Sequence, residues 1–475
     1  MTPNRFLLLL LSFVAHATPA VAQSPPPASD PRLFELIEAV SAERLEKDVR
    51  TLVGFGTRHT LSETESETRG IGAARRFLKA ELERISEDCG GCLEVSFQRY
   101  VQKAGEIARV PSDTEIVNVV AILRGTVHPN RHVIMSGDID SRVSDANDGT
   151  SDSPGANDNA SGMAGVVEAA RVLSRHEFPS TIVLAGLSGE EQGLLGGRHM
   201  AEVAKDEEWQ IVGVLNNDMI GNIHGIDGVI ANDTFRVFSE PTSVTETVAE
   251  RRRRRFTGGE VDGPSRQLAR YVESMTSRYF TNLRALMIYR LDRFGRGGHH
   301  RPFNDAGFAG VRIMETHENY NRQHQDLRTE NGIDYGDTID GVDFDYARRL
   351  TGVNVATLAA LAWAPPAVEE LALSGAVQPS TTLRWPRVDS PLVAGYKVVW
   401  RDTTAPQWQY SRWVGDGKDC GVETPAGDDC REFTLEGVVI DNFFFGLATV
   451  GKDGHESLVK FPGPAPIVTP ERRRR

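Results

Sequence analysis

The sequence predicts an α/β fold with a mostly parallel central sheet flanked by helices, followed by a small all-β sandwich. Two observations predict the first part. The chain contains short, nearly continuous apolar runs, as expected for the strands of a parallel sheet, which are buried on both faces. These runs alternate along the chain with segments in which apolar residues recur at helical spacing. The apolar runs are residues 116–123, 132–135, 181–187, 211–215 and 308–314. A third observation predicts the sandwich, because short β-type runs separated by turn residues fill the last roughly 100 residues, after Pro365.

The predicted helices lie before and between the apolar runs. Apolar residues recur at helical spacing in four segments, 33–53, 71–85, 161–175 and 194–203. A last helix is predicted over 344–363, since Pro365 and Pro366 follow it and cannot continue a helix. We therefore place the α/β domain at residues 23–365 and the sandwich at residues 370–468.

The N-terminus, residues 1–22, is predicted to be a secretory signal peptide. Arg5 supplies a positive start, residues 6–14 supply an apolar stretch, and Ala20-Val21-Ala22 supplies a small-residue cleavage site. The apolar stretch is shorter than the roughly 20 residues that cross a bilayer, and no later window is apolar enough. We therefore expect an exported protein without a membrane span, either periplasmic or secreted.

Composition and cysteine usage narrow the function classes. A formal net charge of -13 and a pI near 5.5 argue against general nucleic-acid binding, which needs a basic surface. The four cysteines fall in two close pairs, Cys89 with Cys92 and Cys420 with Cys430, and export favours two local disulfides. A redox-active or zinc-binding Cys89-Gly-Gly-Cys92 is the alternative, but the chain holds no second CxxC to complete a zinc ribbon.

Carboxylates follow three of the predicted strands at the point where each strand ends. The acidic segments are Gly137-Asp138-Ile139-Asp140-Ser141, Gly189-Glu190-Glu191-Gln192-Gly193 and Asn216-Asn217-Asp218-Met219, with a fourth acidic turn at 154–159. The carboxyl ends of parallel strands meet at one edge of the sheet, so these acids converge in one crevice. Packed carboxylates repel one another unless cations neutralise them. The sequence therefore predicts a metal site, and the number of carboxylates favours two ions over one.

The order and spacing of these acidic motifs are those of a known family. Over roughly residues 110–365 the sequence resembles the two-zinc exopeptidases of the bacterial leucyl aminopeptidase type, relatives of glutamate carboxypeptidase II and glutaminyl cyclase. The motifs that carry the resemblance are Asp138-x-Asp140-Ser141, Pro154-Gly155-Ala156-x-Asp158-Asn159-x-Ser161-Gly162, Glu190-Glu191-x-Gly193-Leu194 and Asn217-Asp218. Each motif alone is weak evidence, but together they are specific.

The resemblance implies a set of metal ligands. Asp158 bridges two divalent ions, while Glu191 holds one ion and Asp218 the other. Asp138 stands at a further ligand position, and the last ligand is a histidine near the end of the domain, for which His324 is favoured over its rival His317. The ions are expected to be zinc, with manganese or cobalt as alternatives.

The resemblance also implies the catalytic residues. Glu190 is the general base that takes a proton from a metal-bridging water and passes it to the leaving amine. Asp140 orients a metal ligand without binding an ion itself. Glu190 and Glu191 are thus neighbouring acids with different tasks.

Two positions depart from the pattern of the family. Most relatives carry His where this chain has Asp138. An aspartate can also ligate zinc, but it does so through an oxygen atom and its side chain is shorter than that of histidine. More oxygen ligation favours harder ions such as manganese. In Gly298-His299-His300-x-x-Phe303, relatives usually show Asp at the position of His299. The role of His299 is therefore open between a substrate contact and a loop residue.

The function that the resemblance implies is an aminopeptidase, which removes N-terminal residues from peptides. One alternative keeps the site but changes the reaction to that of a glutaminyl cyclase or a carboxypeptidase, because the substrate pocket comes from variable loops, here 223–232 and 242–270. A second alternative, from another class, is a non-catalytic binding protein. The intact Glu190 argues against it, because loss of function would not be expected to spare the general base.

The predicted sandwich resembles a fibronectin type III module. The resemblance rests on Leu383-x-Trp385, Gly395-Tyr396-x-Val398-x-Trp400 and a late Gly454-x-x-Ser457. Trp408, Tyr410 and Trp413 are expected to be core residues. The alternative is a strip of aromatic side chains that contacts a cell surface or a polysaccharide.

Overall fold

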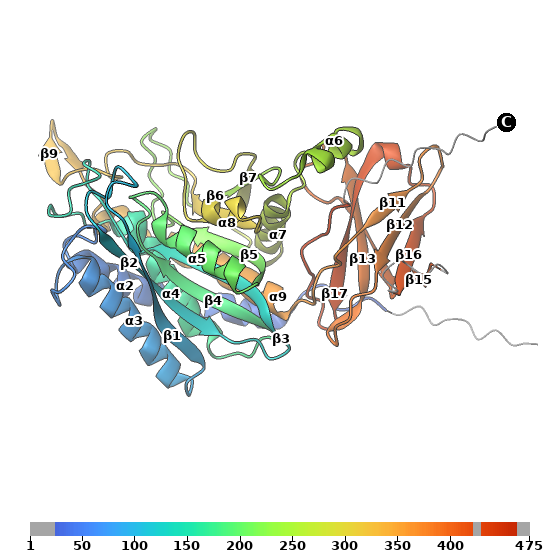
Figure 1. Ribbon diagram of the computed structural model, residues 1–475, viewed down its shortest axis with the longest axis horizontal. Helices are drawn as coiled ribbons and strands as arrows, with labels where there is room; N and C mark the ends of the chain where they lie inside the picture. The colour runs from blue at the N-terminus through green and yellow to red at the C-terminus, as the bar shows by residue number, and fades with distance from the viewer. Residues whose placement is uncertain (1–23, 421–428, 463–475) are drawn as a thin grey trace, which may run out of the picture.

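The structure is a computed structural model, and it describes residues 24–420 and 429–462 (Figure 1). The predicted signal peptide, residues 1–22, lies outside the described residues, as does the end of the predicted sandwich, 463–468. In the two ranges that are described, no helix is long and apolar enough to cross a membrane. A large α/β part is followed by small antiparallel β-sheets, which confirms the predicted fold class.

The α/β part is built on a sheet of eight strands in the order β1-β2-β4-β3-β5-β8-β6-β7, as far as the chain is described. The strands are β1 (Leu93–Gln102), β2 (Thr114–Leu123), β3 (His128–Asp138), β4 (Ser180–Leu187), β5 (Gln210–Asn217), β6 (Thr234–Ser239), β7 (Arg284–Ile288) and β8 (Gly310–Glu315). The central strands β4, β3, β5 and β8 run parallel, while β2 and β6 are antiparallel to the central strands they join. The sheet is therefore parallel at its centre and mixed towards its edges.

Helices cover both faces of this sheet (Figure 1). They are α1 (Pro31–Glu38), α2 (Ala42–Gly54), α3 (Gly70–Asp88), α4 (Gly162–Leu173), α5 (Leu195–Asp206), α6 (Val248–Thr257), α7 (Pro264–Tyr279), α8 (His300–Asp305) and α9 (Phe344–Trp363), with the short turns η1 (Ala156–Ser161) and η2 (Ile339–Gly341) and the hairpin β9 (Arg328–Glu330) and β10 (Ile333–Tyr335). On β3, Val133 and Met135 belong to the larger core with α4 and α9, whereas Ile134 belongs to the smaller core with α5 and α8. This alternation buries β3 on both faces, which explains why its sequence is a continuous apolar run.

As far as it is described, the C-terminal part consists of two small antiparallel sheets that share one core. One sheet has the order β11-β12-β16-β15 and the other β14-β13-β17. The strands are β11 (Ala372–Ser374), β12 (Thr381–Pro386), β13 (Val393–Asp402), β14 (Tyr410–Gly415), β15 (Lys418–Asp419), β16 (Cys430–Leu435) and β17 (Phe443–Gly451), with the turn η3 (Ile440–Asn442) before β17. Leu383 and Trp385 of β12 lie in the same buried cluster as Tyr396 and Val398 of β13. The facing sheets therefore form a sandwich-like core.

Both predicted disulfides are present, Cys89 with Cys92 and Cys420 with Cys430. The first links the end of α3 to the start of β1, so it closes a tight turn. The second lies between the two ends of the segment 421–428, which is outside the described residues. Their presence agrees with the structural role expected of these cysteines.

Buried charges join the sandwich to the α/β part. Arg401 of β13 and Arg270 of α7 both lie 2.8 Å from Asp262, and the exposed fractions of these three side chains are 2% or less. Trp408 lies beside both guanidinium groups, with its ring centroid 5.7 Å from Arg270 and 5.4 Å from Arg401. Trp408 is thus a half-buried contact between the two parts of the molecule.

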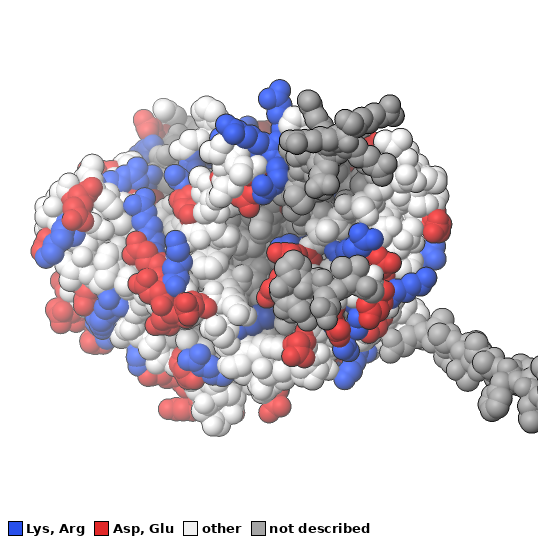
Figure 2. All heavy atoms as spheres, turned by 45° about the vertical axis from the view of Figure 1, so that its right-hand side comes forward, with Lys and Arg blue, Asp and Glu red and all other residues white. Residues whose placement is uncertain are grey.

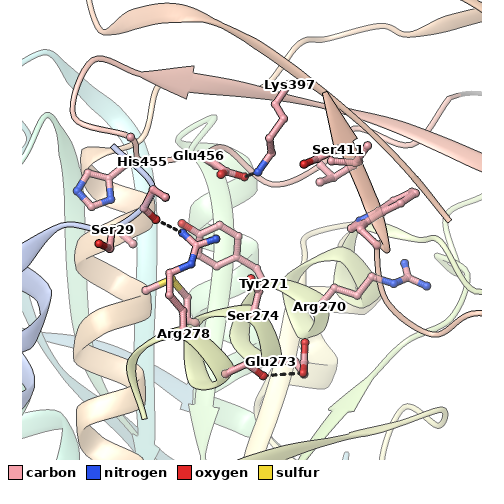
Figure 3. A pocket seen from close by; sticks show the side chains of 18 of the residues that line it. Ser29, Arg270, Tyr271, Glu273, Ser274, Arg278, Lys397, Ser411, His455 and Glu456 are labelled. Carbon is pink, nitrogen blue, oxygen red and sulfur yellow. Dashed lines mark hydrogen bonds and ion pairs between the residues drawn. The ribbon is translucent and has the colours of Figure 1, made fainter. Parts of the chain in front are cut away.

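A cavity of about 430 Å³ lies beside this junction, between the N-terminal segment, α7 and the sandwich (Figure 3). Arg278 of α7 donates a hydrogen bond to the carbonyl oxygen of Ala28 at its edge, and Lys397 pairs with Glu456 on the side of the sandwich. Charged side chains around the cavity are therefore paired with groups of the protein itself.

Acidic and basic side chains are interspersed on the face that Figure 2 shows. The arginine run 251–255 lies in α6, where Arg254 pairs with Glu246 at 2.7 Å. Opposite charges that lie side by side partly cancel, so the electric field of the basic or the acidic side chains extends only a short distance at physiological ionic strength.

We predict that His132 makes the protein less stable in mild acid. His132 of β3 is 1% exposed and stacks on Trp209, with ring centroids 4.3 Å apart, and burial lowers its pKa to about 4. Below the ordinary pKa of about 6.5, the unfolded chain binds a proton at this residue that the folded chain does not. Stability therefore falls as the pH drops from about 6.5 towards 4. Thermal unfolding at pH 7.5 and pH 5 should show a smaller loss of Tm in His132→Phe than in wild type, and equal losses would contradict the assignment.

Candidate metal centre

The acidic residues predicted at strand ends do meet at the carboxyl edge of the central strands. Asp138 is the last residue of β3, Glu190 and Glu191 follow β4, and Asp218 follows β5. Asp158 comes from η1, which leads into α4, as the sequence pattern predicts. Because β3, β4 and β5 are parallel neighbours, their ends deliver these side chains to one place.

Asp158, Glu191 and His324 form a group that fits a metal ion. The Nε2 atom of His324 lies 3.0 Å from Asp158 Oδ2 and 3.0 Å from Glu191 Oε1, and one ligand atom of each residue lies within 4.8 Å of the others. Ligand atoms around a tetrahedral zinc ion, with bonds of about 2.0–2.2 Å, stand roughly 3.3 Å apart. One nitrogen and two carboxylate oxygens are ligands that zinc accepts. The donor set and its spacing therefore fit zinc.

The charges of this group depend on one another. Burial disfavours the ionised forms of Asp158 and Glu191, but the neighbouring His324 outweighs it and holds the pKa of both carboxyls below the usual range. Burial opposes the charged form of His324 as well, yet the two carboxylates raise its pKa to about 9. The two carboxylates are thus stabilised by positive charge beside them, which a proton on His324 or a metal ion would supply in addition to Arg142.

Arg142 and Gln323 hold this group from the side. Arg142 Nε lies 2.6 Å from Glu191 Oε2, and its Nη2 lies 2.7 Å from His324 Nδ1. Gln323 Nε2 donates to Asp158 Oδ2 at 3.2 Å. The backbone of His324 is left-handed, with φ of 55°, a strained conformation that recurs at functional sites. Sequence reasoning missed Arg142, although it directly follows the Asp138-x-Asp140-Ser141 motif.

The Asp140 side chain positions Glu190 and Glu191 by binding their backbone N–H groups. Its carboxylate accepts hydrogen bonds from the backbone N–H groups of Glu190 and Glu191, both at 3.1 Å, and from the Thr60 hydroxyl at 3.0 Å. Asp140 is 1% exposed, and burial together with the charge of Glu191 raises its pKa. The turn that carries Glu190 and Glu191 is therefore fixed by a buried acid.

Glu190 is half-buried at the edge of the same group. Burial, and then the nearby Glu191, Asp218 and Asp138, raise the pKa of Glu190 well above its ordinary value. Its backbone is held by Asp140, while no hydrogen bond to its carboxylate is found within residues 24–420 and 429–462. The Glu190 side chain thus offers an accessible carboxylate beside the candidate ligands.

Asp138 and Asp218 have other partners. Asp138 Oδ1 lies 2.5 Å from His299 Nδ1, and its Oδ2 accepts a hydrogen bond from Asn159 at 2.8 Å. Asp218 Oδ2 lies 2.7 Å from Arg312 Nη2. In the described part of the chain, neither aspartate belongs to a cluster of three ligand atoms. The structure therefore brings together three of the five predicted ligands as a set.

Both histidines left open by the sequence have defined places. His317, the rival of His324, pairs with Asp227 at 2.7 Å on a partly exposed loop, and it is absent from the candidate group. His299 is fully buried against Asp138 and is therefore not an ordinary loop residue. Sequence reasoning missed Arg312, whose signal was a charged residue inside the otherwise apolar run of β8.

Comparisons with known proteins identify relatives of this chain. Residues 118–340 match peptidase family M28. A probable zinc metalloprotease of Leptosphaeria maculans is 42% identical over 441 residues, covering 92% of this chain and 98% of that protein. Another from Pyrenophora tritici-repentis is 40% identical over 442 residues, covering 92% of this chain and 88% of that protein.

Solved structures show the same fold at low identity. The LapA aminopeptidase of Legionella pneumophila matches with a TM-score of 0.52 at 16% identity, over 74% of this chain and 78% of that chain. This likeness concerns the fold, whereas the similarity to the two probable zinc metalloproteases extends along nearly the whole sequence. The chain therefore belongs to peptidase family M28 and is a metallopeptidase.

Proposed function

We propose that this metallopeptidase is a zinc-dependent aminopeptidase that hydrolyses N-terminal residues from peptides. The observation that carries the proposal is the group of Asp158, Glu191 and His324 with the accessible carboxylate of Glu190 beside it. A zinc ion held by these residues would supply Lewis acidity, which polarises a carbonyl group and acidifies water.

The residues around the ion would transfer the proton and hold the reacting groups in position. Glu190 accepts the proton of the attacking water and returns it to the leaving amine, which is the task of a general base placed within reach of both. Asp140 keeps Glu190 in position through the backbone hydrogen bond at 3.1 Å. Arg142 fixes the orientation of Glu191, because its Nε lies 2.6 Å from the carboxylate oxygen that does not face His324.

The charge around the site favours a substrate with a free amine over one with a free carboxylate. A carboxypeptidase needs a cation to bind the terminal carboxylate. Among the described residues, five arginines on and around the site's loops are paired with carboxylates: Arg142 with Glu191, Arg293 and Arg296 with Glu318, Arg312 with Asp218, and Arg322 with Asp340. The surplus of acidic groups suits a positively charged N-terminus.

Export and domain organisation belong to the same proposal. Residues 1–22 would be removed as a signal peptide, and the two disulfides suit an oxidising compartment, either the periplasm or the exterior. Residues 23–365 would form the catalytic domain, and residues 370–468 a fibronectin type III-like module.

The test is hydrolysis of aminoacyl-p-nitroanilides by the purified mature protein. We expect turnover to vanish after chelation and to return with zinc, manganese or cobalt, the rank of the ions showing which one suits the site. The matched control is the N-acetylated form of the best substrate, for which we expect kcat/KM to fall at least about 100-fold because the binding groups for the amine are left unpaired.

Two outcomes would contradict the proposal. Equal hydrolysis of the acetylated substrate would show that a free N-terminus is not required. An absence of turnover with every ion, on this panel and on peptides with N-terminal glutamine, would instead favour a binding protein.

A further inference from the structure

We infer that Asp337 is a positioning residue of the metal centre, which fixes the turn that carries Asp158 and so sets how tightly the centre holds an ion there. The inference deepens the proposed function and rests on the same site. Asp337 is outside the acidic motifs of the sequence and outside the group of Asp158, Glu191 and His324. It acts through the backbone next to Asp158 and not as a ligand.

Three successive backbone N–H groups of the turn η1 point to Asp337. The N–H of Ala156 donates to the carbonyl oxygen of Asp337 at 3.1 Å. The backbone nitrogen of Asn157 lies 3.0 Å from each oxygen of the Asp337 carboxylate, and the N–H of Asp158 donates to Oδ2 at 2.6 Å. Asp337 is 7% exposed, so water competes little for these bonds. A single buried residue thus fixes the backbone that leads into Asp158.

The turn needs such a partner because it is not a regular helix. Asp158 has φ of -106° and ψ of 87°, outside the helical region. Backbone N–H groups at the start of a helical segment have no partner within it, and buried ones must find a partner elsewhere. Arg58 supplies a donor to the same turn, because its Nη2 binds the carbonyl oxygen of Gly155 at 2.8 Å. Arg58 therefore holds a carbonyl group of the turn, and Asp337 holds its N–H groups.

Asp337 and His324 reach Asp158 from the two ends of one segment. His324 Nε2 lies 3.0 Å from Asp158 Oδ2, while Asp337 binds the backbone of Asp158. Between them the chain passes through the hairpin of β9 and β10, whose residues are mostly exposed (Figure 1). Gly336 returns the chain with φ of 114°, a conformation that favours glycine. The placement of Asp337 is therefore tied to that of a candidate ligand, and both residues contact Asp158.

Asp140 gives the same kind of support to a second acidic turn of the centre. Its carboxylate accepts hydrogen bonds from the backbone N–H groups of Glu190 and Glu191 at 3.1 Å. Two buried aspartates thus each fix one acidic turn through backbone N–H groups. Groups that orient metal ligands usually change metal affinity by roughly 10–100-fold. We expect a contribution of this size from Asp337.

The test measures metal binding and needs no turnover. The protein is stripped of metal and titrated with zinc in the presence of a competing chelator. Zinc affinity should fall roughly 10–100-fold in Asp337→Ala. It should fall less in Asp337→Asn, because the amide oxygen still accepts a backbone N–H whereas the NH₂ group cannot. His324→Ala removes a candidate ligand itself and so identifies the ion that binds beside Asp158.

A purely structural role of Asp337 would give a different result. A turn that only stabilises the fold would lower Tm of zinc-free and zinc-loaded Asp337→Ala by the same amount. Weaker zinc binding instead reduces the gain in Tm that zinc brings. The visible absorption of the cobalt-loaded protein should also change in this variant, since it reports the geometry of the ligands. Equal Tm losses with unchanged zinc affinity would overturn the inference.

The matched control is Asp334→Ala in the exposed strand β10. Asp334 accepts a hydrogen bond from the Thr329 hydroxyl at 2.7 Å within the hairpin. We expect zinc affinity within about twofold of wild type, as for most surface substitutions. An equal loss of affinity in Asp334→Ala and Asp337→Ala would assign the effect to the hairpin and would overturn the role of the Asp337 carboxylate.

Asp337→Asn decides the matter if Asp337→Ala does not fold. This variant keeps the shape of the side chain but loses one acceptor, so zinc affinity should still fall about 3–10-fold, the worth of one hydrogen bond. Unchanged affinity would overturn the inference. Weaker zinc binding in the variants of a protein that has no peptidase activity would sink the proposed function alone. Wild-type zinc affinity in the variants of an active enzyme would sink this inference alone.

Discussion

Glu190→Gln is expected to lower kcat by about 10²–10⁴-fold, the usual contribution of a general base. Glutamine has the shape of glutamate but cannot accept the proton of the attacking water. The backbone hydrogen bond from Glu190 to Asp140, at 3.1 Å, does not involve the side chain and is retained. Glu190 is also outside the group of three candidate ligands, so the variant should keep its ion. The loss should therefore appear in kcat with zinc content unchanged.

Two measurements isolate the chemical step. Zinc per chain and Tm of Glu190→Gln should match wild type, and kcat should be compared on the best aminoacyl-p-nitroanilide. Glu202→Gln makes the same substitution at an exposed residue of α5 and should leave kcat within about twofold. Retention of a tenth or more of the wild-type kcat in Glu190→Gln would remove Glu190 from the role of base. Loss of zinc in that variant would assign it to metal binding instead.

The centre of the fold was predictable because its strands are buried on both faces. Residues 181–187 were predicted as a strand from their apolar sequence, and β4 spans Ser180–Leu187 with every residue buried. The outer strands β1, β6 and β7 were not predicted. β1 pairs on one side only and alternates between exposed and partly buried residues, while β7 has five residues and only Ala285 fully buried. Outer strands owe their pairing to neighbours that the local sequence does not show.

The segment 242–270 shows the same limit. The family resemblance suggested that it forms a part of the substrate pocket, whereas residues of this segment contact the sandwich in the structure. Asp262 binds Arg401, and a side chain on Gly258 would collide with the ring of Phe444. Such contacts join segments more than a hundred residues apart, and no local pattern predicts them.

The candidate site was likewise predictable from the sequence only in part. Strand-end carboxylates could be found in the sequence, because topology brings the ends of parallel strands together. The partners of Asp138 and Asp218 could not be found in this way. Asp138 is 161 residues from His299, and the contact between Asp218 and Arg312 depends on how β5 and β8 pair. The positions of acidic residues in the sequence predicted where carboxylates gather. The tertiary fold decides which of these carboxylates contact a histidine or an arginine.

Asp262→Ala is expected to cost about 3–5 kcal/mol of unfolding free energy, the usual effect of removing one partner from a buried charge pair. Asp262 is the shared carboxylate of Arg270 and Arg401, at 2.8 Å from each, and its side chain is 0% exposed. Without it, two buried guanidinium groups face each other across the junction between α7 and β13. Urea unfolding followed by tryptophan fluorescence measures the loss well, since four of the six tryptophans lie after residue 370.

The matched control is Glu432→Ala, which breaks the Arg384–Glu432 pair on the sandwich surface. The exposed fractions of these side chains are 52% and 28%, and we expect a loss of at most about 1 kcal/mol. Adding Arg401→Met to Asp262→Ala should recover part of the stability, because it removes one of the stranded charges. Equal losses in Asp262→Ala and Glu432→Ala would mean that the junction contributes little. The large difference expected here would instead make the sandwich a structural partner of α7, held by charges that water cannot reach.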